Sequence, residues 1–186
     1  MHDLSPLTPL GNAEPSIESI GEVTLEEVTD VALASVAARL GREDDTRLAL
    51  ATLIEVDAPA PSRHAGSTIR AFWTGPDQWM VEAPLETHED LAKMLSNEIG
   101  SAASITEQTD AWCRFDLVGN DLFRALELLC PADTAYWSGG EVQRCSIEHL
   151  GCFVLCRDPS TVSILGPRSA AGSLHHALVT ACHAAF

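Results

Sequence analysis

The sequence carries little positive charge. Eleven Lys and Arg residues stand against 27 Asp and Glu, and Lys93 is the only lysine, so the formal net charge is −16. A surface of this sign repels both the phosphate backbone of nucleic acids and anionic lipid head groups. We therefore expect no nucleic acid and no membrane among the partners of this chain, and solubility is the simplest consequence of the charge.

An export signal and a long apolar run are also missing. The opening residues MHDLSPLTPL contain neither the basic region nor the apolar run of a secretory signal. The longest uncharged stretch, residues 169–186, is rich in Ala, Ser and His and is too short and polar to span a bilayer comfortably. Cysteines in a chain without such a signal are expected to be reduced thiols, so we expect a cytoplasmic protein. The cysteines are Cys113, Cys130, Cys145, Cys152, Cys156 and Cys182.

The common signatures of catalytic and nucleotide-binding sites are absent as well. No G-x-G-x-x-G follows a strand-like segment, and there is no G-x-x-x-x-G-K-[ST], G-x-S-x-G or H-E-x-x-H. Each of these sites depends on the glycines, nucleophile or ligands that its signature supplies. We assign no catalytic, cofactor-binding or metal-binding residue to this chain.

The order of apolar patterns predicts an α+β fold with mostly antiparallel sheets and helices packed against them. Residues 1–22 are predicted to be a tail or arm, followed by one α+β domain over 23–186, and the Pro- and Gly-containing loop 57–66 is a possible sub-domain boundary. The order of elements hints at two related sub-domains. Strands are predicted at 23–28, 69–73, 78–83, 105–119, 142–150, 152–156 and 161–165, and helices at 31–55 with an interruption at Gly41, 91–99, 121–129 and 169–184.

Some turns and helix starts can be assigned to single residues. Thr87 and Asp90 resemble a capping box for the helix over 91–99, and Asn120 and Ser169 are candidate caps of later helices. Gly151 is predicted to separate the strands 142–150 and 152–156.

Four potential metal ligands lie within twelve residues of one another. They are Cys145, His149, Cys152 and Cys156. Zinc needs four such donors converging in a tetrahedron, and the spacing C-x3-H-x2-C-x3-C matches no common zinc ribbon or finger. The register between the two strands decides whether the residues meet in space. The apolar run CFVLC favours buried structural thiols over a metal site.

The last predicted helix carries a histidine pair and a polar stripe. With Leu174, Ala177, Leu178 and Ala181 buried, the opposite face shows Ser173, His176, Thr180 and His183. A general base would need a nucleophile or acid within hydrogen-bond reach, and the sequence offers none beside His175 and His176. A solvated or partner-facing stripe is therefore the preferred interpretation.

Two acids and four tryptophans are candidate functional groups. Asp110 and Asp116 could be catalytic carboxylates, but acids at strand ends and on solvent-facing strand positions are commonly just solvated. Three of the four tryptophans, Trp73, Trp79, Trp112 and Trp137, lie in strand-like segments where aromatic rings pack well, and some could line a partner interface.

Five segments, in their order along the chain, resemble the gamma subunits of heterotetrameric sarcosine oxidases. They are LASVAARLG (33–41), FWTGPDQWMVEAP (72–84), ITEQTDAW (105–112), IEHLGCFVL (147–155) and LGPRSAAGSLHHAL (165–178). The similarity runs from about residue 18 to the C-terminus, and GPDQW, QTDAW and PRS-x3-SLHHAL are specific in combination. Cys145 departs from the family pattern, which has Thr there; no catalytic role attaches to this position.

The resemblance implies a fold related to the folate-binding aminomethyltransferase-like domains and a complex of four different subunits. Such a complex oxidatively demethylates sarcosine to glycine, passes the one-carbon unit to tetrahydrofolate or releases it as formaldehyde, and forms hydrogen peroxide. In that family FAD, FMN, NAD, tetrahydrofolate and zinc belong to the other subunits. The resemblance therefore implies an accessory chain without catalytic activity or cofactor of its own, whose partners are the alpha, beta and delta subunits.

Two other functions fit the sequence. One is a stand-alone folate-binding protein of the aminomethyltransferase type, which would bind tetrahydrofolate by itself. The other is a metal or redox module built on the Cys145, His149, Cys152 and Cys156 cluster.

Overall fold

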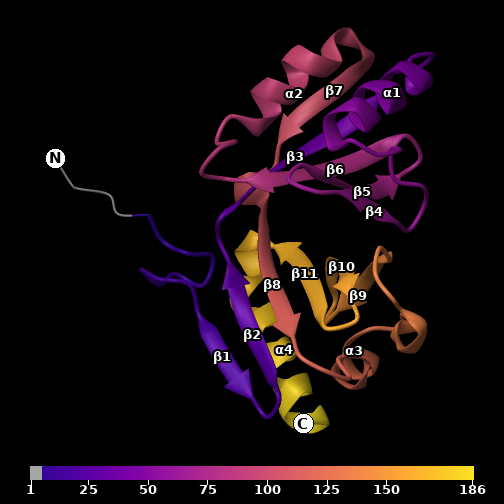
Figure 1. Ribbon diagram of the computed structural model, residues 1–186. Coiled ribbons are helices and arrows are strands. Elements are labelled where there is room, and N and C mark those ends of the chain that lie inside the picture. The colour runs from indigo at the N-terminus through magenta and orange to yellow at the C-terminus, as the bar shows by residue number, and fades with distance from the viewer. Residues whose placement is uncertain (1–5) are drawn as a thin grey trace, which may run out of the picture. The chain divides into compact units, whose positions relative to one another are not determined.

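The computed structural model describes residues 6–186 and has the predicted α+β architecture, with two antiparallel sheets and four α-helices over these residues (Figure 1). The chain divides into two compact units. Unit 1 combines the described residues up to Thr29 with Ala111–Phe186, and unit 2 is Asp30–Asp110. The chain therefore passes between the units twice, once at 29/30 and once at 110/111.

Unit 1 is a six-stranded sheet with two helices on one face. The strands are β1 (Ile17–Ile20), β2 (Val23–Val28), β8 (Trp112–Val118), β9 (Val142–Ile147), β10 (Leu150–Asp158) and β11 (Thr161–Pro167), and their order in the sheet is β1-β2-β8-β11-β10-β9. All neighbours are antiparallel. Helices α3 (Phe123–Leu129) and α4 (Ala171–Ala185) share one core with the sheet, whose largest members include Phe115, Leu126, Ile164 and Leu178. Two 3-10 helices, Thr134–Tyr136 and Arg168–Ala170, lie after α3 and before α4, and a third, Thr109–Ala111, spans the boundary between the units before β8.

Unit 2 is a five-stranded antiparallel sheet in the order β4-β5-β6-β3-β7. Its strands are β3 (Val31–Ala38), β4 (His64–Gly66), β5 (Arg70–Gly75), β6 (Gln78–Pro84) and β7 (Ala103–Glu107). Helices α1 (Glu43–Ile54) and α2 (Leu91–Ile99) pack on one face, and the 3-10 helix Gly100–Ala102 follows α2. The hairpin β5–β6 and the helix α2 were both predicted from local patterns, and both are confirmed.

The prediction of a helix over residues 31–40 is wrong, because this segment is strand β3. It lies between β6 and β7, with Val36 opposite both Trp79 and Ile105. Its small and β-branched residues alternate between the two faces of the sheet, which suits a central strand. Leu40, which the helical pattern counted as buried, is 98% exposed.

The single strand predicted over residues 105–119 is two strands in two different sheets. β7 ends at Glu107, the 3-10 helix Thr109–Ala111 breaks the extended backbone, and β8 begins at Trp112. The Thr109 side chain anchors this 3-10 helix to β3, because its Oγ1 accepts a hydrogen bond from the Leu33 backbone N–H at 3.0 Å. The predicted inward face of β8, with Cys113, Phe115 and Leu117, is confirmed.

The turn between β9 and β10 is at Glu148 and His149, not at Gly151. Ile147 pairs with Leu150, which leaves a two-residue turn, and both turn residues have positive φ, 48° and 66°. Positive φ at both central positions is the requirement of a type I′ hairpin turn. Gly151 lies within β10 opposite Ser146.

The predicted helix caps are also wrong. α2 starts after Asp90 without a side-chain cap, and the Thr87 hydroxyl faces the Pro84 carbonyl at 3.4 Å and the His88 ring at 2.8 Å. α3 and α4 likewise begin without a side-chain hydrogen bond at their first turn, at Leu122 and Ala170, so neither Asn120 nor Ser169 caps a helix.

Part of the predicted N-terminal arm is tied to unit 1. Of residues 1–22, positions 1–5 lie outside the described residues, 17–20 form β1, and the backbone before β1 is held by Glu27. The Glu27 carboxylate is 1% exposed and accepts hydrogen bonds from the N–H groups of Leu10 (2.9 Å) and Ser16 (3.1 Å). This carboxylate satisfies two backbone donors that no sheet partner reaches.

The loop 57–66, which the sequence offered as a possible boundary, is part of unit 2 and leads into β4. The boundaries between the units lie instead between β2 and β3 and between β7 and β8, where the chain leaves one sheet and enters the other. Across residues 6–186 we find no helix with the length and apolarity needed to cross a membrane.

Candidate functional site

Helix α4 presents two different faces. Leu174, Ala177, Leu178 and Ala181 are buried against the core, while Ser173, His176, Thr180 and His183 are exposed. The polar stripe predicted from the sequence is therefore confirmed. The Thr180 hydroxyl donates to the His176 carbonyl at 2.8 Å, so it is engaged within the helix itself.

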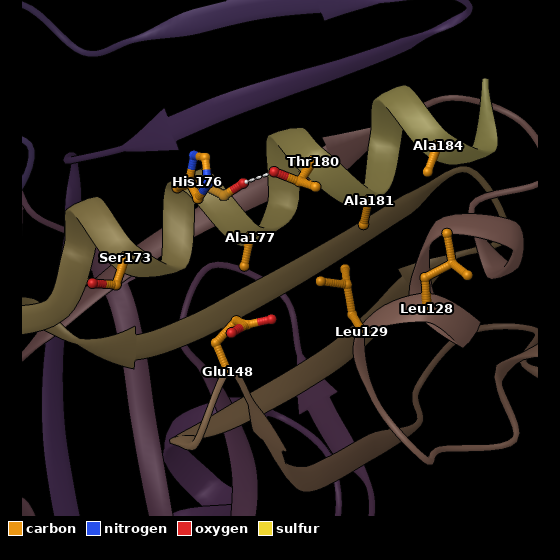
Figure 2. Close-up of a pocket in the computed structure, with 9 residues that line it drawn as sticks. All are labelled: Leu128, Leu129, Glu148, Ser173, His176, Ala177, Thr180, Ala181 and Ala184. Atoms are coloured by element: carbon orange, nitrogen blue, oxygen red, sulfur yellow. Dashed lines mark hydrogen bonds between the residues drawn. The ribbon is translucent and has the colours of Figure 1, made fainter.

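Beside this stripe, α3, α4 and the β9–β10 turn enclose a shallow groove of about 540 Å³ (Figure 2). Ala177, Ala181 and Ala184 of α4 face Leu128 and Leu129 of α3 across it. The small alanine side chains leave room between the two helices, which is why a groove remains there. Ser173, His176, Thr180 and Glu148 complete the lining.

The groove has the features of a binding surface for an apolar segment. Leu128 is 61% exposed, although it is a large apolar side chain at the groove wall. Figure 2 shows the His176 ring projecting to the side of α4 away from Glu148, so these two titratable groups do not face each other. Leucine and alanine side chains flanked by a few polar groups and one carboxylate suit recognition of a partner by contact.

His175, the neighbour of His176, has a different environment. Its ring packs on Phe115 with centroids 5.5 Å apart, and its Nε2 lies 3.0 Å from Glu18 Oε1 of β1. Nε2 is buried and has no hydrogen-bond partner among the described residues, so its approach to Glu18 is a close contact without a hydrogen bond. No sequence pattern indicates this contact, because β1 lies within residues 1–22, which were predicted to be a tail or arm.

The four candidate metal ligands do not converge. Cys145 and Cys152 are direct partners across β9 and β10, His149 lies in the turn, and the Cys156 thiol donates to the Asp158 carbonyl at 3.3 Å. Over residues 6–186, no three His, Cys, Asp or Glu side chains gather in an arrangement that could hold a metal ion.

The thiols differ in their acidity. Burial raises the pKa of Cys113, Cys152, Cys156 and Cys182 to about 11. Cys130 differs from these, because a hydrogen bond from the Cys145 thiol lowers the pKa of Cys130 to about 7. The same bond and burial raise the pKa of Cys145, since its ionisation would remove the donor and add a second negative charge.

The two carboxylates considered from the sequence lie in different settings. Asp116 is bound by Arg114 through two hydrogen bonds on β8. Asp110 is exposed within the 3-10 helix Thr109–Ala111. Neither acid lines the groove.

Three of the four tryptophans lie in strands, as predicted: Trp73 in β5, Trp79 in β6 and Trp112 in β8. The buried Trp79 donates its indole N–H to the Pro59 carbonyl at 2.9 Å, and the Trp112 ring lies 5.4 Å from that of Phe153. These contacts give the rings a packing role.

A second, smaller cavity of about 210 Å³ lies between α3, the 3-10 helix Thr134–Tyr136 and strands β10 and β11. Trp137 and Cys156 line it, together with Thr134, which is 5% exposed and whose hydroxyl has no hydrogen-bond partner. Its volume is below the roughly 300–1,000 Å³ typical of ligand pockets.

No family model matches this sequence, and no curated protein matches it. Among solved structures, the chain is similar to a chain of the heterotetrameric sarcosine oxidase from Corynebacterium sp. U-96, solved in complex with pyrrole 2-carboxylate. The TM-score is 0.75 at 22% identity, over 89% of this chain and 86% of that one.

The chain is also similar to the glycine cleavage system aminomethyltransferase T from Bartonella henselae, with a TM-score of 0.63 at 11% identity. This match covers 85% of our chain and 45% of the aminomethyltransferase chain. Identities this low establish a shared fold and nothing further. The predicted relation to aminomethyltransferase-like folds is confirmed.

Proposed function

We propose that this chain is a non-catalytic accessory subunit of a heterotetrameric sarcosine oxidase complex, equivalent to its gamma subunit. The complex would oxidatively demethylate sarcosine to glycine, pass the one-carbon unit to tetrahydrofolate or release it as formaldehyde, and form hydrogen peroxide. The alpha, beta and delta partner subunits would hold FAD, FMN, NAD, tetrahydrofolate and zinc.

The observation that carries this proposal is the extent of the match to a sarcosine oxidase chain. It spans 89% of this chain and 86% of the other, so the shared fold extends over nearly all of both chains. The aminomethyltransferase, by contrast, is matched over 45% of its length. The order of the five similar sequence segments supports the same assignment.

The groove between α3 and α4 offers a place for a partner. We assign to it a partner segment with apolar side chains for Leu128, Leu129 and the alanines of α4, and with a cationic side chain near Glu148. A cation is favoured because the chain has a net charge of −16 and Glu148 lines the groove. A second copy of this chain would meet repulsion between like charges.

The test is a pull-down of the tagged chain from its native cells, followed by identification of the bound subunits. We expect flavin-containing subunits in equal amount, and sarcosine oxidation with peroxide formation in the eluted complex. Recovery of the chain alone, under conditions that keep other assemblies intact, would contradict the proposal. So would turnover of an amine by the chain purified without companions.

A stand-alone folate-binding protein is the second candidate, favoured by the TM-score of 0.63 to the aminomethyltransferase. It requires saturable tetrahydrofolate binding by the isolated chain. Calorimetric titration of the purified chain with tetrahydrofolate separates the two functions, because the accessory subunit is expected to show no binding and the folate protein one site.

A further inference from the structure

The groove beside α4 follows the axis of that helix. From α4 its lining includes, at intervals of four, four and three residues, Ser173, Ala177, Ala181 and Ala184. Residues at these intervals share one face of a helix, so the groove runs along α4 for about three turns, or about 16 Å. Among the described residues that line it none belongs to a strand, because Glu148 lies in the turn between β9 and β10.

The groove combines a floor of small side chains with a wall of large ones. Ala177 and Ala181 are 7% and 6% exposed, whereas Leu128 on α3 is 61% exposed. Alanines at the contact between two helices leave space into which the side chains of a third helix can fit. Covering an exposed leucine removes apolar surface from water, so filling this space is favourable.

The surroundings of the groove favour a helix over other occupants. An added strand needs the free edge of a strand for its backbone hydrogen bonds, and the described lining offers none. A second copy of this chain would bring another net charge of −16 toward the carboxylate of Glu148. A helix needs no backbone partner and presents side chains every three or four residues, which is the spacing of the lining along α4.

Charge determines the order of the contacts along the groove. Of the described residues that line it, Glu148 is the only Asp, Glu, Lys or Arg. In Figure 2 this side chain lies on the side of Ser173 and Ala177, and Leu128 lies on the side of Ala184. Ala177 and Ala184 are seven residues apart, which corresponds to about 10 Å along the axis of α4. On a helix that lies along α4, a cation for Glu148 and an apolar side chain for Leu128 are therefore also about seven residues apart.

We propose that the groove binds an amphipathic α-helix of another protein chain. The helix carries Lys or Arg near Glu148, a large apolar residue about seven positions away against Leu128, and an apolar residue between them over Ala177 and Ala181. That the other chain is a subunit of the same complex rests on the proposed function. The helical occupant and the spacing of its residues rest on the groove alone.

Photo-cross-linking from the full-length tagged chain in its native cells identifies the occupant. p-Benzoylphenylalanine replaces Leu128, the cells are irradiated, and the cross-linked peptide is sequenced by mass spectrometry. We expect one segment of another chain, with Lys or Arg about seven residues from the cross-linked residue and an apolar residue three or four positions from each. The same group in place of Leu48, an exposed leucine of α1 that does not line the groove, should not reach that segment.

Substitutions in the identified segment test its conformation and its charge. Proline at a central position, on the face turned away from the groove, breaks a helix and should abolish the cross-link, whereas alanine at the same position should keep it. Glu148→Lys should weaken co-purification about tenfold, and changing the basic residue of the segment to Glu should restore at least part of it. Glu98→Lys, at an exposed position of α2 that does not line the groove, is the matched control and should leave co-purification unchanged.

The outcomes separate this inference from the proposed function. Co-purification of flavin-containing subunits without a cross-link at Leu128 would overturn the helix and leave the accessory function standing. A cross-link to a helix with the expected spacing, in a protein outside any oxidase complex, would support the helix and contradict the function. A cross-link to a strand, a loop or a second copy of this chain, or equal yields from the proline and alanine variants, would overturn the inference.

Discussion

Arg114 and Asp116 bind each other through two parallel hydrogen bonds on one face of β8, from Nε to Oδ1 at 2.8 Å and from Nη2 to Oδ2 at 2.7 Å. Residues two apart on a strand share a face, so the pair lies opposite Cys113 and Phe115, which point into the core. Both charged side chains are 13% exposed. The structure thus commits both oxygens of Asp116, a candidate catalytic carboxylate in the sequence, to a structural contact.

Replacing this carboxylate should destabilise the protein. Asp116→Ala removes both hydrogen bonds from a mostly buried guanidinium, and we expect a loss of about 2–4 kcal/mol in the free energy of unfolding. Urea unfolding measures it, and a double-mutant cycle with Arg114→Ala isolates the coupling. Asp133→Asn, at an exposed position without a side-chain cap, should change stability by less than about 0.5 kcal/mol. Equal effects of the two variants would show that the pair contributes little.

The buried Glu27 should hold the backbone before β1. Glu27→Ala leaves the N–H groups of Leu10 and Ser16 without their acceptor, and we expect a loss of about 2–3 kcal/mol together with faster proteolysis in residues 6–16. Limited proteolysis with mass spectrometry locates the cleavage. Glu26→Gln changes the exposed neighbour on β2 and serves as the control. Cleavage at the same rate in both variants would count against this role.

If a partner binds in the groove, substitutions of its lining should weaken partner binding while substitutions elsewhere should not. Leu128→Glu places a charge on an exposed apolar wall, and Glu148→Lys reverses the charge beside it; each should reduce partner affinity about tenfold or more without unfolding the chain. Co-purification and circular dichroism measure the two properties. Leu48→Glu, at an exposed leucine of α1 that does not line the groove, should leave binding unchanged. Retention of the partner by both groove variants would place the interface elsewhere.

Thiol labelling should depend on pH differently for Cys130 than for the buried cysteines. Since the pKa of Cys130 is lowered to about 7, its thiolate is lost as the pH falls below that value, and its alkylation rate should rise through pH 7 and level off above it. Cys113, Cys152 and Cys182, with pKa values raised to about 11, should stay unlabelled near pH 8 in the native protein. Quantitative mass spectrometry follows each site. Cys145→Ala should move the inflection of Cys130 to higher pH, and an unmoved inflection would exclude this hydrogen bond as its cause.

The position of the β9–β10 turn can be tested by introducing a glycine at His149 and removing the glycine at Gly151. His149→Gly should stabilise the protein by about 0.5–1 kcal/mol, because glycine adopts positive φ without the penalty that a Cβ brings. Gly151→Ala should be neutral or slightly stabilising, since no atom lies within 4 Å of the added Cβ and the residue has extended strand backbone. Thermal unfolding compares the two. A strong loss from Gly151→Ala would instead support a turn at that residue.

Local patterns predicted the elements whose residues interact mainly with near neighbours. The hairpin β5–β6 follows from two alternating runs around the turn Gly75-Pro76-Asp77, and the buried face of α4 follows from the spacing of its apolar residues. The polar stripe with His176 could be predicted for the same reason. The groove could not be predicted from α4 alone, because Leu128 comes from α3 and Glu148 from the β9–β10 turn.

Elements defined by distant partners were predicted poorly. Residues 31–40 fit a helical spacing, but β3 pairs with β6 and β7, whose residues lie far along the chain. Residues 105–119 look like one strand, yet their two halves pair with different sheets.

The sequence by itself determined the α+β class, the acidic surface, the β5–β6 hairpin and which face of α2 and α4 is buried, because periodicity and turn chemistry act over a few residues. Only the tertiary structure decided that β3 is a central strand, that residues 105–119 serve two sheets, and which side chains from α3, α4 and the β9–β10 turn line one groove. Strand pairing and side-chain contacts between elements depend on residues that are distant in the chain, and no local pattern encodes their register.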